Sequence, residues 1–139
     1  MTAGVDLGVP QIQAIQSDED VVRVRQLVRT VAVAVKLSLV DQTKLVTAAS
    51  ELARNTLVYG GGGTAEVVTV EDDRRRGVRI LFADSGPGIA DIELALTDGY
   101  TTGNGLGLGL SGARRLVDEF DVWTAVGEGT RITITKWSR

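Results

Sequence analysis

Residues 103–110 read Gly-Asn-Gly-Leu-Gly-Leu-Gly-Leu, a run in which glycine recurs at every second position. Glycine costs roughly 0.5–1 kcal/mol at each position inside a helix, so a helix that only had to begin here would not need four of them. Glycines before a helix expose backbone N–H groups at its positive end, and such groups bind anions. The run predicts a phosphate-binding helix start, with a flexible glycine linker as the alternative. Its candidate residues are Gly103, Gly105, Leu106, Gly107 and Gly109.

The spacing of these glycines differs from that of the common nucleotide-binding loops. A Walker loop would end in Gly-Lys-Ser/Thr, which does not follow here. A dinucleotide-binding fingerprint that paired Gly103 with Gly105 would need glycine at position 108, which is leucine, and no strand pattern precedes the run. The glycine loop of eukaryotic-type protein kinases fails on the same spacing.

Hydrophobic periodicity on both sides of the run predicts nine elements in the order β-α-α-β-β-α-α-β-β. They are strand 9–15, a helix from Ser17, helix 41–58, strands 64–70 and 78–83, helix 91–98, a helix after 105, and strands 120–126 and 130–137. Hairpin-joined strands with helices between them imply an α+β fold. We expect a two-layer α/β sandwich whose mixed, mostly antiparallel sheet is covered on one face by helices. A doubly wound parallel sheet would need strands that alternate singly with helices.

The expected helices have recognisable ends and apolar stripes. Ser17 and Asp20 form a capping box for the first helix, and Asp41 is expected to cap the second. The stripe of the first helix is typical of a core-facing surface. The stripe expected for the helix after 105 consists of Leu106, Leu110, Ala113, Val117 and Phe120.

Composition restricts the chemistry that is available. The 139 residues suffice for one domain, 1–139, and the 17 glycines are about 12% of the chain against a typical ~7%. The absence of cysteine and histidine excludes zinc fingers, cysteine nucleophiles, Ser-His-Asp triads and a histidine phosphoacceptor. The net charge of −3 argues against nonspecific nucleic-acid binding. With neither a signal-peptide pattern nor a membrane-spanning stretch, we expect a cytoplasmic protein.

Glu51 and Asn55 lie one turn apart on the expected second helix, in line with Thr47. The apolar stripe of that helix, which contains Leu45 and Leu52, lies on another face. A carboxylate one turn before a carboxamide is a candidate for catalysis or metal binding. The plain alternative is a solvent-facing helix surface.

The segment Asp84-Ser85-Gly86-Pro87-Gly88-Ile89 follows directly on an apolar strand. Gly86 and Gly88 allow a ligand to approach the backbone, and Asp84 is a fixed acceptor for an amino group, although an ordinary turn has the same composition. In the last strand Thr130 has the parity of Ile132 and Ile134, so its hydroxyl faces the core or a pocket.

Taken in order, these segments resemble the ATP-binding fold shared by gyrase B, Hsp90, bacterial histidine kinases and MutL, over essentially the whole chain. Residues 50–55, 84–89 and 107–120 are similar to the small RsbT-type serine/threonine switch kinases of the stressosome. A histidine kinase would bring its own dimerisation and phosphoacceptor segment.

The resemblance implies ATP and Mg²⁺ as the small molecules bound. Asn55 would ligate the Mg²⁺, and Glu51 would be the catalytic carboxylate that orients or deprotonates the attacking hydroxyl. Asp84 would accept from the adenine amino group with support from Thr130, and Gly86 and Gly88 would admit the nucleotide. Residues 100–105 would form a lid, and backbone amides near Gly105, Gly107 and Gly109 would bind phosphates.

The resemblance also implies the protein partners. The kinase would phosphorylate a STAS-domain antagonist protein and, once released from it, activate a PP2C-type phosphatase. The alternative is a nucleotide-binding interaction module, an anti-sigma factor or phosphatase activator with minor or no kinase activity. A simple ATPase is a third possibility. Many histidine kinases carry a basic residue three positions after the metal-binding asparagine, where this chain has Val58, so Arg54 and Arg114 stay open as the phosphate-neutralising base.

Overall fold

The structure is a computed structural model that describes residues 9–96 and 110–138. Its elements follow the predicted order. They are β1 (Gln11–Ile15), α1 (Asp18–Ala34), α2 (Leu39–Val58), β2 (Gly63–Glu71), β3 (Arg76–Asp84), α3 (Ile92–Ala95), α4 (Leu110–Leu116), β4 (Glu119–Ala125) and β5 (Gly129–Trp137).

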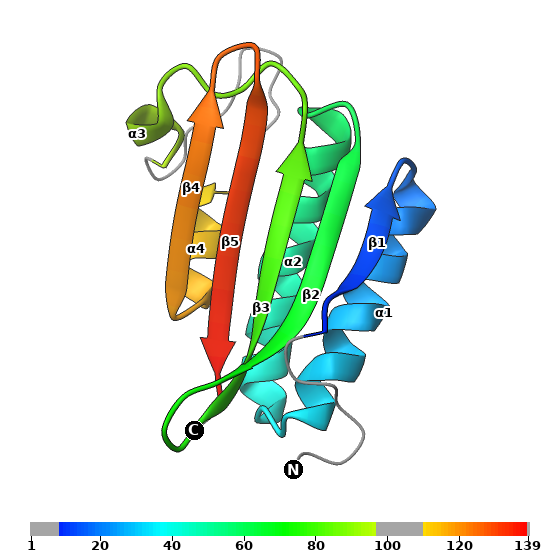
Figure 1. Cartoon of the computed structure of the whole chain (residues 1–139), viewed down its shortest axis with the longest axis vertical. Coiled ribbons are helices and arrows are strands. Elements are labelled where there is room, and N and C mark those ends of the chain that lie inside the picture. Colours follow the sequence, from blue (N-terminus) through cyan, green and yellow to red (C-terminus); the bar gives the residue numbers. More distant parts are fainter. Residues whose placement is uncertain (1–8, 97–109, 139) are drawn as a thin grey trace.

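The five strands form one sheet in the order β1-β2-β3-β5-β4, and all four neighbouring pairs are antiparallel. Helices α1, α2 and α4 lie together behind the sheet, so that one face is covered and the other is open (Figure 1). The predicted two-layer α+β sandwich is confirmed. The sheet was expected to be mixed and mostly antiparallel, and among the described strands it is antiparallel at every pair.

Alternation along the strands decides which side chains face the helices. The covered face of the central strands is apolar in its middle rows and carries polar side chains only toward its two ends, and the facing stripes of α1 and α2 are buried against it. Examples from both layers are Val67, Ile80, Phe82, Ile134, Val24, Val28, Leu45 and Leu52. Each such side chain contributes roughly 1.5–3 kcal/mol when it is removed from water. Within residues 9–96 and 110–138, no helix is long and apolar enough to cross a membrane.

The start of α2 differs from the prediction. Asp41 was expected as its cap, but the helix begins two residues earlier, at Leu39 after Ser38. Ser38 has an extended backbone, and its hydroxyl accepts from the Asp41 N–H at 3.1 Å. Asp41 instead occupies the first turn, where its carboxylate is still favoured by the helix dipole. The predicted cap of α1 is confirmed, because the Ser17 hydroxyl accepts from the Asp20 N–H at 3.3 Å.

The stripe expected for the last helix is shorter in the structure. Helix α4 ends at Leu116, so Val117 and Phe120 are not helical, and Phe120 belongs to β4 opposite Ile134. Both side chains still pack against the core. Strand β4 begins at Glu119, shortly after the helix, and continues the apolar pattern on the same side, so the sequence predicted a longer helix. Leu106 lies outside the described residues.

Candidate nucleotide site

Asp84 ends β3 at the point where the sheet opens onto a loop. It lies opposite Gly63 on one neighbouring strand and opposite Thr130 on the other. Its carboxylate accepts from the Gly86 N–H at 2.9 Å. Burial raises the pKa of the Asp84 carboxyl above its ordinary value of 3.8, against backbone N–H donors of Gly86 and Thr130 that lower it. The result is a partly desolvated acceptor held in a fixed position.

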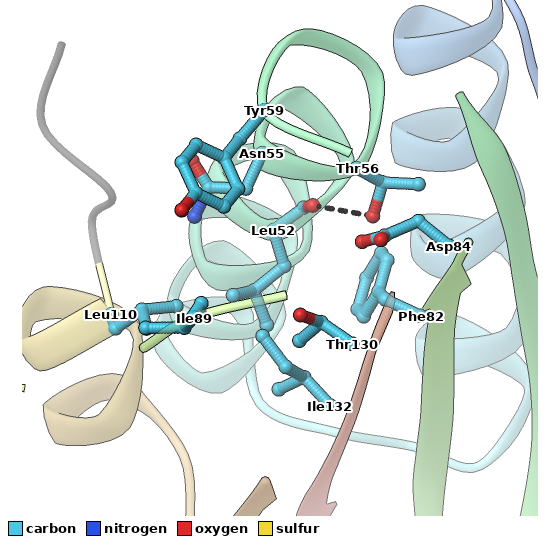
Figure 2. Close-up of a pocket in the computed structure, with 10 residues that line it drawn as sticks. All are labelled: Leu52, Asn55, Thr56, Tyr59, Phe82, Asp84, Ile89, Leu110, Thr130 and Ile132. Atoms are coloured by element: carbon cyan, nitrogen blue, oxygen red, sulfur yellow. Dashed lines mark hydrogen bonds between the residues drawn. The ribbon is translucent and has the colours of Figure 1, made fainter. Parts of the chain in front are cut away.

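Asp84 lines a cavity between the sheet and α2. Its lining residues are Leu52, Asn55, Thr56, Tyr59, Phe82, Asp84, Ile89, Leu110, Thr130 and Ile132. Figure 2 shows Asp84 and Phe82 on one side of the cavity, and Tyr59, Ile89 and Leu110 on the other. The free volume is about 20 Å³, which is roughly enough for one water molecule.

The structure brings three of the predicted site residues, Asn55, Asp84 and Thr130, together on this cavity. Glu51 is exposed one turn earlier on α2 and does not line it. Gly86 and Gly88 lie in the loop after β3. Five candidates lie outside the described residues, together with the expected lid: Gly103, Gly105, Leu106, Gly107 and Gly109.

Gly86 has a packing reason to be glycine. A Cβ atom on Gly86 would lie 2.7 Å from the Gly60 carbonyl oxygen, and a Cβ atom on Gly60 would collide with the Asp84 side chain. The turn after α2 and the loop after β3 therefore approach each other backbone to backbone. This contact holds Asp84 from behind, and it is independent of any ligand.

Thr130 belongs to a small network of hydroxyl groups. Its Oγ1 lies 2.9 Å from the Thr124 Oγ1, which donates to the Gly129 carbonyl at 3.1 Å. Thr124 has one hydroxyl proton, which it donates to the Gly129 carbonyl. In the contact between the two hydroxyl groups Thr130 is therefore the donor and Thr124 the acceptor. Thr130 then presents lone pairs to the cavity. Sequence reasoning missed Thr124, although its parity with Phe120 and Val122 places it on the covered face of β4.

A single peptide unit crosses between α2 and β4 beside the cavity. Its carbonyl, that of Gly88, accepts from the Tyr59 hydroxyl at 3.0 Å. Its N–H, that of Ile89, donates to the Thr124 hydroxyl at 2.8 Å. Tyr59 was not among the site residues predicted from the sequence. Its partner is 29 positions away along the chain, so no local pattern could have indicated the bond.

The acceptors and walls of the cavity match an adenine base in chemistry. Leu52, Phe82, Ile89, Leu110 and Ile132 supply apolar surface for a flat ring. The carboxylate of Asp84 and the lone pairs of Thr130 are acceptors for an amino group. A bicyclic base is several times larger than one water molecule, so the cavity has to widen before a base can enter.

A Mg²⁺ ion bound at this site would have few protein ligands. In the described part of the chain, no three or more aspartate, glutamate, histidine or cysteine side chains are grouped to hold a metal ion. Asn55 offers an amide oxygen at the edge of the cavity. Mg²⁺ commonly uses one or two protein oxygens together with phosphate and water oxygens, so the residues present fit such an ion bound with a nucleotide.

Comparison with known proteins agrees with this geometry. Residues 40–138 match the family model described as histidine kinase-, DNA gyrase B-, and HSP90-like ATPase. The chain belongs to this family of ATPases.

Within the family the chain is a serine/threonine-protein kinase of the RsbT type. The serine/threonine-protein kinase RsbT of Bacillus subtilis (strain 168) is 45% identical over 125 residues, which are 90% of this chain and 94% of that protein. An anti-sigma F factor of Clostridium novyi (strain NT) is 31% identical over 116 residues, 76% of this chain and 81% of that protein.

Two solved structures share the fold at lower identity. The RsbU and RsbW domains of Rv1364c from Mycobacterium tuberculosis align with a TM-score of 0.66 and 21% identity, over 94% of this chain and 33% of that chain. The catalytic domain of histidine kinase ThkA aligns with a TM-score of 0.55 and 19% identity, over 92% of this chain and 98% of that chain. These similarities support the two-layer architecture.

Proposed function

We propose that residues 1–139 form one kinase domain that transfers the γ-phosphate of ATP to a serine or threonine of a small STAS-domain antagonist protein. The observation that carries the proposal is the convergence of Asn55, Asp84 and Thr130 on one cavity, in a chain 45% identical to a serine/threonine-protein kinase. In this proposal Asp84 and Thr130 accept from the adenine amino group, and the apolar walls hold the ring.

Binding of the nucleotide's phosphate groups is assigned to the other predicted residues. Asn55 holds the Mg²⁺ that accompanies the nucleotide, and backbone N–H groups at Gly103, Gly105, Leu106, Gly107 and Gly109 bind phosphate oxygens. Gly86 and Gly88 give the nucleotide access beside Asp84. Arg54 on α2 and Arg114 on α4 are both exposed and stay candidates for neutralising phosphate charge.

Glu51 is proposed as the catalytic carboxylate. The substrate hydroxyl oxygen attacks the γ-phosphorus, the bond to the β–γ bridging oxygen breaks, and ADP leaves with that electron pair. The hydroxyl proton passes to the Glu51 carboxylate. The exposure of Glu51 one turn from Asn55 supports this role, because a protein substrate can reach it.

Partner switching completes the proposal. The released kinase would bind and activate a PP2C-type phosphatase. The support is the similarity to an anti-sigma F factor, and the alignment with a chain that carries both RsbU and RsbW domains. Acting on protein partners in this way, the chain would work in the cytoplasm.

Phosphate transfer from labelled ATP to a purified STAS-domain protein tests the proposal. We expect Asn55→Asp to abolish transfer, because a carboxylate in place of the amide repels the phosphates and changes the metal ligand. Thr47→Asp adds the same charge to an exposed position of α2 and should leave transfer intact. Absence of transfer by the unaltered protein to any STAS partner would contradict the kinase proposal.

The same variant separates the kinase from an interaction module. If Asn55→Asp protein lost phosphate transfer but kept both partner binding and its effect on a PP2C-type phosphatase, binding rather than phosphorylation would be the working function. The proposed partner switch requires that release of the STAS-domain antagonist depend on phosphate transfer. Co-purification with and without ATP measures that release.

A further inference from the structure

The walls of the cavity differ in how firmly they are held. Leu52 lies in the middle of α2, and Phe82, Thr130 and Ile132 lie on paired strands of the sheet. These walls cannot move without breaking a helix or a ladder of backbone hydrogen bonds. Ile89 lies in the loop after β3, and Tyr59 is the residue that follows the last turn of α2. A cavity of about 20 Å³ therefore widens on the side where Ile89 and Tyr59 lie together with Leu110, the first residue of α4.

The loop that carries Ile89 is fastened to the hairpin of β4 and β5. The Ile89 N–H donates to Thr124, and the Gly127 N–H donates to the Pro87 carbonyl at 2.8 Å. Gly88, at φ +76°, is packed so closely that a Cβ atom there would collide with the Ala125 carbonyl oxygen. The loop is thus held at three successive residues by the strands behind it.

Tyr59 is held much more lightly. It is half-buried at the end of α2, where its ring packs against the edge of the core, and among the described residues its side chain has one hydrogen bond, from the hydroxyl to the Gly88 carbonyl. The chain beyond it turns through Gly61 and Gly62, both at positive φ, and the backbone of such a turn is adaptable. When that one bond breaks, the ring can turn away from the cavity while the Gly88–Ile89 peptide stays bound to Thr124.

We infer that the Tyr59 hydroxyl is a latch: bonded to the Gly88 carbonyl it holds the ring across the cavity, and a nucleotide enters only after that bond breaks. The inference rests on the proposed nucleotide site. The apparent dissociation constant of a ligand equals the intrinsic constant divided by the fraction of molecules that are open. By stabilising the closed state, in which its ring lies across the cavity, Tyr59 lowers the nucleotide affinity. It acts as a positioning residue.

Tyr59→Phe tests this directly because it keeps the ring and removes only the hydroxyl. A neutral hydrogen bond contributes about 0.5–1.5 kcal/mol, so the open fraction should rise about two- to tenfold. We expect the association rate of a ribose-labelled fluorescent ADP to rise by that factor in stopped-flow measurements, with the dissociation rate unchanged. The melting temperature without nucleotide reports whether the variant is folded.

Thr124→Val is the control at the other end of the same peptide unit, where it removes the bond from the Ile89 N–H together with the bonds of the Thr124 hydroxyl to Thr130 and Gly129. We expect a lower melting temperature and no faster association. If both variants accelerated association equally, the whole loop rather than Tyr59 would control entry, and the latch would be wrong.

The remaining outcomes are equally distinct. An unchanged or slower association rate for Tyr59→Phe, or a faster dissociation rate, would show that the hydroxyl does not oppose entry or that it binds the nucleotide, and would overturn the latch. Failure of the unaltered protein to bind ADP with Mg²⁺ would instead overturn the nucleotide site itself.

Discussion

The two ends of α2 are attached to the rest of the molecule by different kinds of contact. At its first turn Asp41 lies 3.6 Å from the Nζ of Lys136, which is 4% exposed and also lies 3.5 Å from Asp118. Just after its last turn the corresponding attachment is the neutral bond from the Tyr59 hydroxyl to the Gly88 carbonyl. Figure 1 shows these ends at opposite ends of the sheet, with β5 running from the cavity end to the lysine end.

The difference separates a permanent attachment from a releasable one. Opening a buried ion pair leaves charges without partners in a medium of low dielectric constant, which costs several kcal/mol. Opening a neutral hydrogen bond costs about 1 kcal/mol, since water replaces the partner. Motion is therefore expected at the cavity end, at Tyr59 just after the last turn of α2, where a ligand can use it.

Removing the ion pairs at the start of α2 should have the largest effect on stability. Lys136→Ala leaves Asp41 and Asp118 facing each other without their shared cation, and we expect the free energy of unfolding to fall by about 3–5 kcal/mol. Denaturant unfolding measures this fall. Lys44→Ala removes an exposed lysine of the same helix and should change stability by less than about 0.5 kcal/mol. A loss below that control value for Lys136→Ala would mean that both ends of α2 are weakly attached.

A substitution of Asp84, at the cavity end, should change nucleotide binding rather than stability. Asp84→Asn replaces a charged acceptor, and hydrogen bonds to charged groups contribute about 1.5–3 kcal/mol, so ADP affinity should fall by about 10- to 100-fold. Calorimetric titration with ADP and Mg²⁺ measures the change. Asp121→Asn removes an exposed carboxylate on β4 and should bind as the unaltered protein does. Equal affinity for both variants would exclude Asp84 from the site.

The pH dependence of ADP binding tests the role of Asp84 at the cavity end through a smaller expected effect. Burial places the pKa of Asp84 above 3.8 in the folded protein, so this group favours the folded state at low pH and loses that contribution as the pH rises through the raised pKa. Binding has the opposite sign, because the ionised carboxylate is the better acceptor for an amino group. We expect ADP affinity to weaken a few-fold as the pH is lowered from 7 toward that pKa. Asp84→Asn protein should lack this component.

The smallest effect is expected at Thr69, which lies in one row across the sheet with Val78 and Lys136. Its buried hydroxyl oxygen has no hydrogen-bond partner among the described residues. Thr69→Val should therefore be neutral or stabilising by up to about 1 kcal/mol. Thr56→Val should instead be destabilising, because the Thr56 hydroxyl donates to the Leu52 carbonyl at 3.0 Å. Thermal unfolding of both variants gives the comparison.

Much of the fold could be predicted because periodicity is a local property of the chain. The alternation in β2, β3 and β5 and the stripes of α1 and α2 each lie within one element. The start of α2 was placed wrongly because Ser38 and Asp41 are both good capping residues, and only the packing of the chain decides between them.

The site was predictable where a motif carries it and unpredictable where distant segments meet. Asn55, Asp84 and Thr130 stand in recognisable segments, and the structure brings them to one cavity. The bonds of Tyr59 and Thr124 to the Gly88–Ile89 peptide join positions 29 and 35 residues apart, with no local pattern. Lys136 shares the parity of Ile132 and Ile134 in the last strand, so its burial was predictable from the sequence, although it was not predicted.

The placement of β5 between β3 and β4 has a consequence for the order of folding. Asp84 and Thr130 become neighbours only when β3 pairs with β5, and that pairing closes a long stretch of chain that includes α3 and α4. Closing such a stretch costs entropy before its contacts form, so long-range pairings are slow to form, whereas the contacts between the successive helices α1 and α2 are more local. A nucleotide that binds across these strands would meet its site late in folding. We therefore expect bound nucleotide to slow unfolding and to leave the refolding rate nearly unchanged.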